Sequence, residues 1–322
     1  MITLDPAAIA AAATRIAPLA RRTPVERSAL LAEAGNTVWL KMEIWQATGS
    51  FKMRGALNRM AQLDATERAG GVVTASAGNH AQGVAACAVA LGIHATIVVA
   101  ADASPAKVAA LRRYDAQWVE LRQLGRDYDE AEAAGIALAR ELERPFISPY
   151  NDAAVIAGQG TVAHELLEDL PDLDVIVVPV GGGGLAAGIG VWAHHVNPAI
   201  RVIGVQSEAS PAMHAAFAAG ALVTVPLAAS LADGLAGNIE PGSITYALCR
   251  AHLASVALVT EDAIAVAMRY LMETQHVLVE GSGAVGVAAL LSGAVVVPPG
   301  SRVGVILSGR NVTLDWVRRV LS

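Results

Sequence analysis

Lys52 is the residue best suited to covalent chemistry, because a primary amine that can lose its proton forms a Schiff base with an aldehyde. The chain otherwise meets its need for positive charge with arginine: among 23 basic residues, the only lysines are Lys41, Lys52 and Lys107. A lone lysine after a turn is often no more than a solvated charge. The residues before Lys52 favour chemistry, since Gly49 permits an unusual backbone, Ser50 can form hydrogen bonds and Phe51 offers a ring surface beside the amine.

A second chemical motif is a run of four glycines, Gly181, Gly182, Gly183 and Gly184, which follows an apolar segment at 175–180 and precedes a helical pattern. Glycines let backbone N–H groups converge on an oxyanion, and the following helix N-terminus adds a favourable dipole. The run therefore predicts a phosphate-binding loop. Two alternatives stay open: a purely structural turn, or a loose match to a dinucleotide fingerprint, with Glu208 as its acidic residue.

A third motif, Ser76-Ala77-Gly78-Asn79-His80, lies where another predicted strand passes into a helix. Its exposed N–H groups, together with Ser76, suit a carboxylate, and the amide of Asn79 can hydrogen-bond a ring oxygen. The alternative is an ordinary helix start, with Asn79 as its cap and His80 as a satisfied junction residue.

The elements that must position these motifs follow from composition and periodicity. The chain has 322 residues, 54% of them apolar and 16% charged, which suits helices that cover buried sheets. From residue 72 onward, predicted strands alternate with predicted helices, and this indicates an α/β fold with parallel sheets. Residues 144–152 carry two prolines and no periodicity, so we expect them to cross between two domains.

Near the N-terminus, Asp5-Pro6 predicts a helix start, and the pattern then predicts a short helix at 28–34 and a strand at 37–43. Strands are expected at 72–75, 95–100, 117–121, 175–180, 201–205, 255–260 and 302–307. Helices are expected at 54–63, 80–91, 105–114, 127–143, 155–170, 185–196, 262–275 and 284–291.

Several classes of protein are disfavoured. The net charge of −6 gives no footprint for nucleic acid or an anionic membrane. Cys87 and Cys249 lack metal-ligand spacing and suggest reduced thiols in the cytoplasm. The N-terminal stretch is not typical of a signal peptide, and we expect no membrane-spanning helix.

The segment Thr48-Gly49-Ser50-Phe51-Lys52-Met53-Arg54-Gly55-Ala56 resembles the cofactor lysine segment of fold-type II pyridoxal phosphate (PLP) enzymes, the group that includes threonine dehydratase and serine racemase. The resemblance extends over nearly the whole chain. It implies a fold like the tryptophan synthase β subunit, with two doubly wound parallel-sheet domains. Residues 1–48 and 150–322 would form the large PLP-binding domain, and residues 49–149 a smaller inserted domain.

The resemblance also implies roles for single residues. Lys52 would bind PLP covalently, Phe51 would lie beside its ring, and Gly181 to Gly184 would hold its phosphate. Asn79 would meet the 3-oxygen and Ser308 the pyridine nitrogen. The substrate carboxylate would bind at Ser76, Gly78, Asn79 and His80. The acidic residues that hold a divalent cation in some members are replaced by Gln206 and Ala212, so we expect no metal.

The function implied is that of a PLP-dependent lyase, a dehydratase that converts a β-hydroxy amino acid, by default L-threonine or L-serine, to a 2-oxo acid and ammonia. Alternatives are a dehydratase of hydroxyaspartate or of a hydroxyectoine-degradation intermediate, which the unusual Arg310 keeps open, a serine racemase, or an NAD-binding oxidoreductase. Ala77 stands where serine racemases have a serine that acts as a base, which favours dehydration. The resemblance further implies a homodimer or homotetramer.

Overall fold

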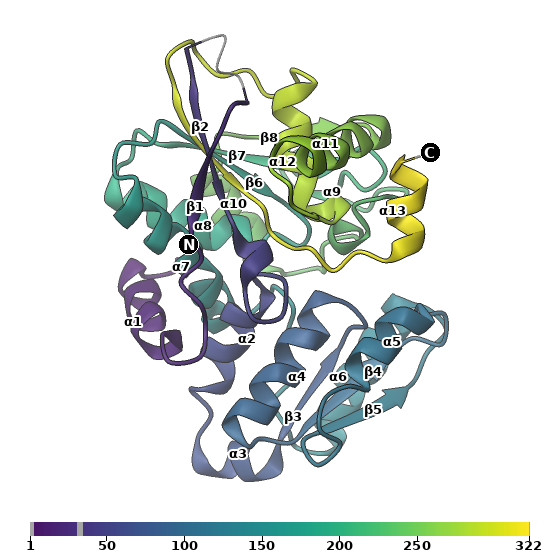
Figure 1. Ribbon diagram of the computed structural model, residues 1–322. Helices are drawn as coiled ribbons and strands as arrows, with labels where there is room; N and C mark the ends of the chain where they lie inside the picture. Colours follow the sequence, from purple (N-terminus) through teal and green to yellow (C-terminus); the bar gives the residue numbers. More distant parts are fainter. Residues whose placement is uncertain (1–2, 31–34, 322) are drawn as a thin grey trace.

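The computed structural model describes residues 3–30 and 35–321, whose strands form two sheets (Figure 1). The larger sheet has the order β1-β2-β9-β6-β7-β8, and every neighbouring pair is parallel except β1 with β2. Its strands are β1 (Val25–Ser28), β2 (Thr37–Lys41), β6 (Val175–Pro179), β7 (Arg201–Ser207), β8 (Ser255–Val259) and β9 (Arg302–Ile306). The smaller parallel sheet consists of β3 (Val72–Ala75), β4 (Ala95–Val99) and β5 (Val119–Gln123).

Helices cover both faces of the larger sheet. Strand β6 is buried along its whole length: Ile176 and Val178 pack into one hydrophobic cluster, and Val175 and Val177 into another. A continuous apolar run is what a strand covered on both faces requires. The first cluster includes residues of α1 (Pro6–Ile16), α7 (Ala153–Asp169), α8 (Gly184–Val196), α9 (Ala212–Ala219) and α10 (Ile244–His252). The second includes residues of α11 (Glu261–Thr274), α12 (Gly281–Leu291) and α13 (Leu314–Leu321).

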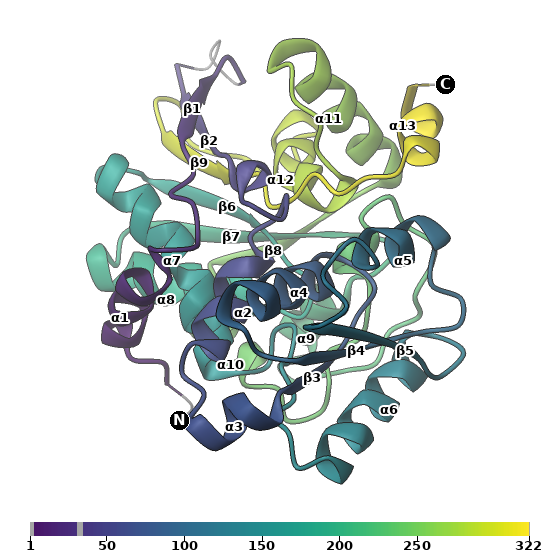
Figure 2. The same cartoon turned by 60° about the horizontal axis from the view of Figure 1, so that its bottom comes forward.

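The smaller sheet is layered in the same way, and Figure 2 shows α6 (Tyr128–Glu141) on the side of the sheet opposite α4 (Asn79–Leu91). Residues of α2 (Lys52–Met60), α4 and α5 (Pro105–Leu111) share one hydrophobic cluster with this sheet, and α6 packs into a separate one. Helix α3 (Ala65–Gly70) was not predicted; it begins with a capping box in which Asp64 and Glu67 bond each other's backbone.

The predicted α/β fold with parallel sheets is confirmed. The helix predicted at 28–34 is wrong at its first residue, because Ser28 ends β1 and pairs with Val38 of β2; residues 31–34 lie outside the described part. The larger sheet draws its strands from residues 25–41 and 175–306, and the smaller from residues 72–123. The domain boundaries at 48/49 and 149/150 stay a prediction. In the described ranges, no helix is both long and apolar enough to cross a bilayer.

Helices α7 and α8 approach each other closely through glycines. A Cβ atom on Gly188 would lie 2.5 Å from the carbonyl oxygen of Ile156 and 2.6 Å from the amide nitrogen of Gly160. Both neighbours are backbone atoms, so neither can move without displacing α7. This contact fixes α8, whose first residue is the last glycine of the four-glycine loop.

We therefore expect Gly188→Ala to destabilise the protein by about 1–3 kcal/mol, the usual cost of forcing extra atoms into a packed interior. Denaturant unfolding monitored by circular dichroism measures the change. Gly70→Ala is the matched control, because a Cβ atom there meets nothing within 4 Å. Equal stability of the two variants would contradict this account of the contact.

Candidate active site

Lys52 is the first residue of α2, and the segment before it docks on the loop that follows β9. The N–H of Phe51 donates to the carbonyl of Ser308 (3.1 Å), and Ser50 forms an isolated bridge with Gly309. Gly49 has a φ of 75°, a conformation that favours glycine, and a Cβ atom there would lie 2.7 Å from Oδ1 of Asn311. The turn that delivers Lys52 is thus shaped by the Ser308 loop.

The amine of Lys52 has no carboxylate in salt-bridge contact within the described chain. Its Nζ donates to the carbonyl of Pro149 (2.8 Å) and lies 5.3 Å from the centroid of the Phe51 ring. Burial lowers the pKa of Lys52 to about 8, although the charge of Glu280 opposes the shift. A buried amine without a close counter-ion gives up its proton readily, as nucleophilic chemistry requires.

Asn79, at the start of α4, joins the two sheet units through its side-chain amide. Its Nδ2 donates to Oε1 of Glu280 (2.7 Å), and its Oδ1 accepts from Nδ2 of Asn311 (2.7 Å). Burial, together with the nearby Asp233, raises the pKa of Glu280 to about 7. We did not predict Glu280 as a site residue; a carboxylate directly before the apolar glycine-rich helix α12 was the signal that could have indicated it.

The other residues predicted for the carboxylate pocket surround the N-terminus of α4. Oγ of Ser76 accepts from the N–H of Gly78 (3.1 Å). The side chain of His80 turns to the crossing segment, where Nε2 donates to the carbonyl of Ile147 (2.9 Å). Burial, and then the charge of Lys52, lowers the pKa of His80 to about 3, so its ring is neutral. The backbone N–H groups of this first helical turn, rather than the imidazole, are suited to an anion.

The four glycines form a loop that leaves no room for side chains. A Cβ atom on Gly182 would overlap the ring of Tyr150, and one on Gly181 would lie 3.1 Å from Cα of Leu235. Gly183 has a φ of 92°, which favours glycine. Helix α8 starts directly after it, at Gly184, so its free N–H groups lie at the loop. The arrangement is that of an oxyanion cradle.

Tyr150, which sequence reasoning missed, links this cradle to the lysine. It follows Pro149, whose carbonyl accepts from Lys52, and its ring supports Gly182. Its hydroxyl accepts from the N–H of Glu240 (3.2 Å). No motif marks a tyrosine in an irregular segment, so only the folded chain reveals this contact.

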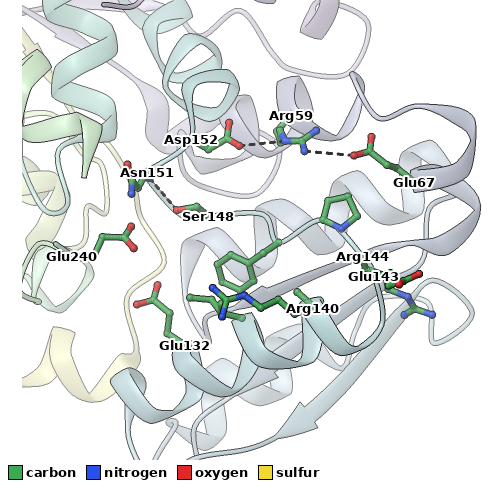
Figure 3. Close-up of a pocket in the computed structure, with 14 residues that line it drawn as sticks. Arg59, Glu67, Glu132, Arg140, Glu143, Arg144, Ser148, Asn151, Asp152 and Glu240 are labelled. Carbon is green, nitrogen blue, oxygen red and sulfur yellow. Dashed lines mark hydrogen bonds and ion pairs between the residues drawn. The ribbon is translucent and has the colours of Figure 1, made fainter. Parts of the chain in front are cut away.

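A cavity of about 580 Å³ borders the same crossing segment and is drawn in Figure 3. Ser148 and Asn151 line it, together with residues of α6, and Glu132 and Glu240 lie near each other at one end. At another edge, Arg59 reaches Asp152 (3.3 Å). Neither Lys52 nor the glycine loop lines this cavity, although the crossing segment that borders it contacts Lys52 through Pro149.

Comparison with known proteins decides the family. The model of a family described as "Pyridoxal-phosphate dependent enzyme" matches residues 16–309. The chain belongs to this family. An L-threonine ammonia-lyase of Thermotoga maritima is 42% identical over 323 residues, which cover 100% of this chain and 79% of that protein. The catabolic L-threonine dehydratase of Escherichia coli K12 is also 42% identical, over 95% of this chain and 92% of its own.

The fold matches as well. The solved structure of maize serine racemase superimposes with a TM-score of 0.92 at 35% identity, covering 99% of this chain and 97% of the other. The prediction of a fold-type II PLP enzyme is thereby confirmed. The family match at residues 16–309 includes the lysine segment, the Asn79 motif and the glycine loop, and it ends within the Ser308 loop.

The residues of this PLP enzyme fit their cofactor. PLP needs an amine for its aldehyde and a cradle for its phosphate, which Lys52 and the side-chain-free loop at 181–184 offer. The tasks of the single residues stay predictions: Phe51, Asn79, Ser308 and the glycines for the cofactor, and Ser76, Gly78, Asn79 and His80 for the substrate.

No group of three or more His, Cys, Asp or Glu side chains in the described residues is placed to hold a metal ion. At the position where some members have an acidic residue, Oε1 of Gln206 accepts from the N–H of His214 (2.9 Å). That the enzyme needs no metal stays a prediction.

The lowered pKa of Lys52 makes a testable prediction. Only the uncharged amine attacks the aldehyde of PLP. The rate at which the apo-protein captures PLP should therefore rise about tenfold per pH unit at low pH and level off at high pH, with a midpoint near pH 8. Stopped-flow absorbance follows the capture, with Lys52→Ala as the control that captures none. A midpoint near the ordinary lysine pKa of 10.5 would contradict the burial of the amine.

Proposed function

We propose that the protein is an ammonia-lyase that converts a small β-hydroxy amino acid, by default L-threonine or L-serine, to a 2-oxo acid and ammonia. The observation that carries the proposal is the buried amine of Lys52, held by a carbonyl in place of a carboxylate and linked through Pro149 and Tyr150 to the glycine cradle. The relatives from Thermotoga maritima and Escherichia coli, both named as acting on L-threonine, support it.

The chain's own residues divide the work of the elimination. PLP, when bound, supplies an aldehyde for the substrate amine and a ring that withdraws electrons from the α-carbon. Lys52, uncharged above its lowered pKa, takes the α-proton as the general base. The electron pair of the broken C–H bond forms the Cα–Cβ double bond as the C–O bond breaks, and the β-hydroxyl takes up one proton in place of the one removed and leaves as water. The released enamine tautomerises to an imine, which water hydrolyses to the 2-oxo acid and ammonia. The free N–H groups of the first turn of α4 bind the substrate carboxylate, which holds the α-carbon within reach of the Lys52 amine.

Ser308 supports elimination over slower carbanion chemistry. It is buried, and as a neutral hydroxyl it does not stabilise a protonated pyridine nitrogen. A ring left unprotonated would withdraw electrons less strongly, which would favour immediate loss of the β-hydroxyl over reactions that need longer storage of charge. The dehydration of an acidic substrate such as hydroxyaspartate remains an alternative, because Arg310 is exposed next to this loop.

We further propose that the enzyme acts in the cytoplasm as a homodimer or homotetramer. Cys87 and Cys249 are free and buried, as in a chain that does not rely on disulfides. The oligomer is proposed from family resemblance, and gel filtration with light scattering tests it.

The substrate proposal predicts that the purified holoenzyme releases ammonia and 2-oxobutanoate from L-threonine, and pyruvate from L-serine. Coupled dehydrogenase assays measure both oxo acids. A panel with threo-3-hydroxyaspartate and D-threonine sets the order of kcat/KM. A marked preference for hydroxyaspartate would replace the default substrate, and Lys52→Ala, which lacks the base and the PLP attachment point, should abolish all turnover.

Serine racemase is the second candidate function, favoured by the close superposition on the maize enzyme. Racemisation needs a base on each face of the α-carbon, and the methyl group of Ala77 cannot move a proton. We expect the wild type to form D-serine at less than about 1% of its elimination rate, a loss in line with one missing general base. Ala77→Ser should raise that fraction, measured by chiral chromatography. Rapid racemisation by the wild type would overturn the assignment of Ala77.

A further inference from the structure

Four charged side chains lie together beside the lysine helix and are here called the ion cluster: Lys41, Glu43 and Arg54 are buried, and Glu165 is partly buried. Arg54 has no exposed surface. Its Nε and Nη2 each donate to one carboxylate oxygen of Glu43, both at 2.8 Å, and its Nη1 donates to Glu165 at 2.7 Å. Lys41 donates to Glu165 at 2.6 Å. The cluster therefore joins α2 to β2, to the short helix η2 (Glu43–Trp45) and to α7.

Arg54 lies two residues after Lys52 in α2. Successive side chains of an α-helix are about 100° apart, so these two point to nearly opposite sides of the first turn. Lys52 reaches Pro149 on one side, and Arg54 reaches Glu43 and Glu165 on the other. The turn that carries the amine is thus held from behind by the guanidinium.

The start of α2 is also held by the Ser308 loop, through the N–H of Phe51, and by α7, where Oε1 of Gln159 accepts from the N–H of Gly55 (3.2 Å). Arg54 adds a side-chain contact of a different kind. A planar guanidinium that binds a carboxylate through two parallel bonds fixes both distance and orientation, which one ammonium cannot do. A buried ion pair is, by contrast, a weak source of net stability, since both charges lose their water. The fork of Arg54 on Glu43 is better suited to alignment than to stabilisation.

We propose that Arg54 and Glu43 are positioning residues that set the place of the Lys52 amine. The inference rests on the proposed function, because it assumes that Lys52 holds PLP and moves the α-proton. The position of the Lys52 amine would then depend on the two-bond contact between Arg54 and Glu43, and not merely on the presence of two opposite charges.

Arg54→Lys and Glu43→Asp test this, because both keep the net charge of the ion cluster and break the matched geometry. Lys41→Met is the control: it removes a whole charge from the cluster, but in the described residues the hydrogen bonds of the Lys41 amine go to Glu165 and the carbonyl of Thr23, and none goes to α2. Each holoenzyme is assayed with L-threonine, melted by calorimetry and reduced with borohydride, after which mass spectrometry gives the fraction of residue 52 that carries PLP.

We expect kcat to fall about 10²-fold in Arg54→Lys and Glu43→Asp, as for a misplacement on the order of 1 Å, with KM changed by less than about threefold. The PLP-bearing fraction of Lys52 should fall with it in the folded protein. Lys41→Met should melt at a lower temperature and keep kcat and the PLP-bearing fraction within about twofold, since the fork remains.

Wild-type kcat and PLP attachment in folded Arg54→Lys and Glu43→Asp would overturn the inference, as would an equal loss of kcat in Lys41→Met. If only one of the first two variants folds, that variant alone decides. A wild-type enzyme whose residue 52 carries no PLP would instead overturn the proposed function, so the two failures are distinguishable.

Discussion

The contact of the buried Arg54 guanidinium with Glu43 on one side and Glu165 on the other is the interaction that ties α2 to η2 and α7. Burial alone would lower the pKa of Arg54, but Glu43 and Glu165 raise it above the usual value. Burial likewise opposes ionisation of Glu165, yet Arg54 and Lys41 hold its pKa below the usual range. The guanidinium of Arg54 contacts both carboxylates, so α2, η2 and α7 cannot move independently of one another. Buried ion pairs contribute little net stability, and their main effect is to fix the relative positions of the elements that carry them.

The two buried lysines show how one residue type is made inert or reactive. Lys41 donates to a carboxylate of the ion cluster at 2.6 Å and to the carbonyl of Thr23 at 2.7 Å; burial lowers its pKa, but the charges of Glu43 and Glu165 oppose the shift. Within the described residues, the amine of Lys52 hydrogen-bonds the carbonyl of Pro149 and no carboxylate. The nearby Glu280 adds little, because burial and Asp233 raise its own pKa to about 7 and leave it partly protonated at neutral pH. The amine of Lys52 is thus the more reactive of the two, because no carboxylate of the described residues contacts it.

Sequence reasoning succeeded where the signal is local. Alternation of apolar runs and helical periods located most strands and helices, because burial on both faces leaves a direct mark on the residue pattern. It failed where the signal lies in pairs distant along the chain. Glu165 is 111 residues from Arg54, and Glu280 is 201 residues from Asn79, so neither contact could be predicted without the fold. The part of His80 in the substrate carboxylate pocket, implied by the resemblance, stays a prediction; its imidazole donates to the carbonyl of Ile147.

The crossing segment shows why an irregular stretch can be part of an active site. Phe146 forms an isolated bridge with Val73 of β3, and the pairing does not continue, so the following carbonyls are not bound in the hydrogen bonds of a strand. The carbonyl of Ile147 is free to accept from Thr74 and His80, and that of Pro149 from Lys52. Tyr150 then supports the glycine loop. In a regular strand these carbonyls would have accepted hydrogen bonds from the neighbouring strand, and Lys52 would have lacked its acceptor. The irregular backbone of the segment therefore contributes to holding the amine.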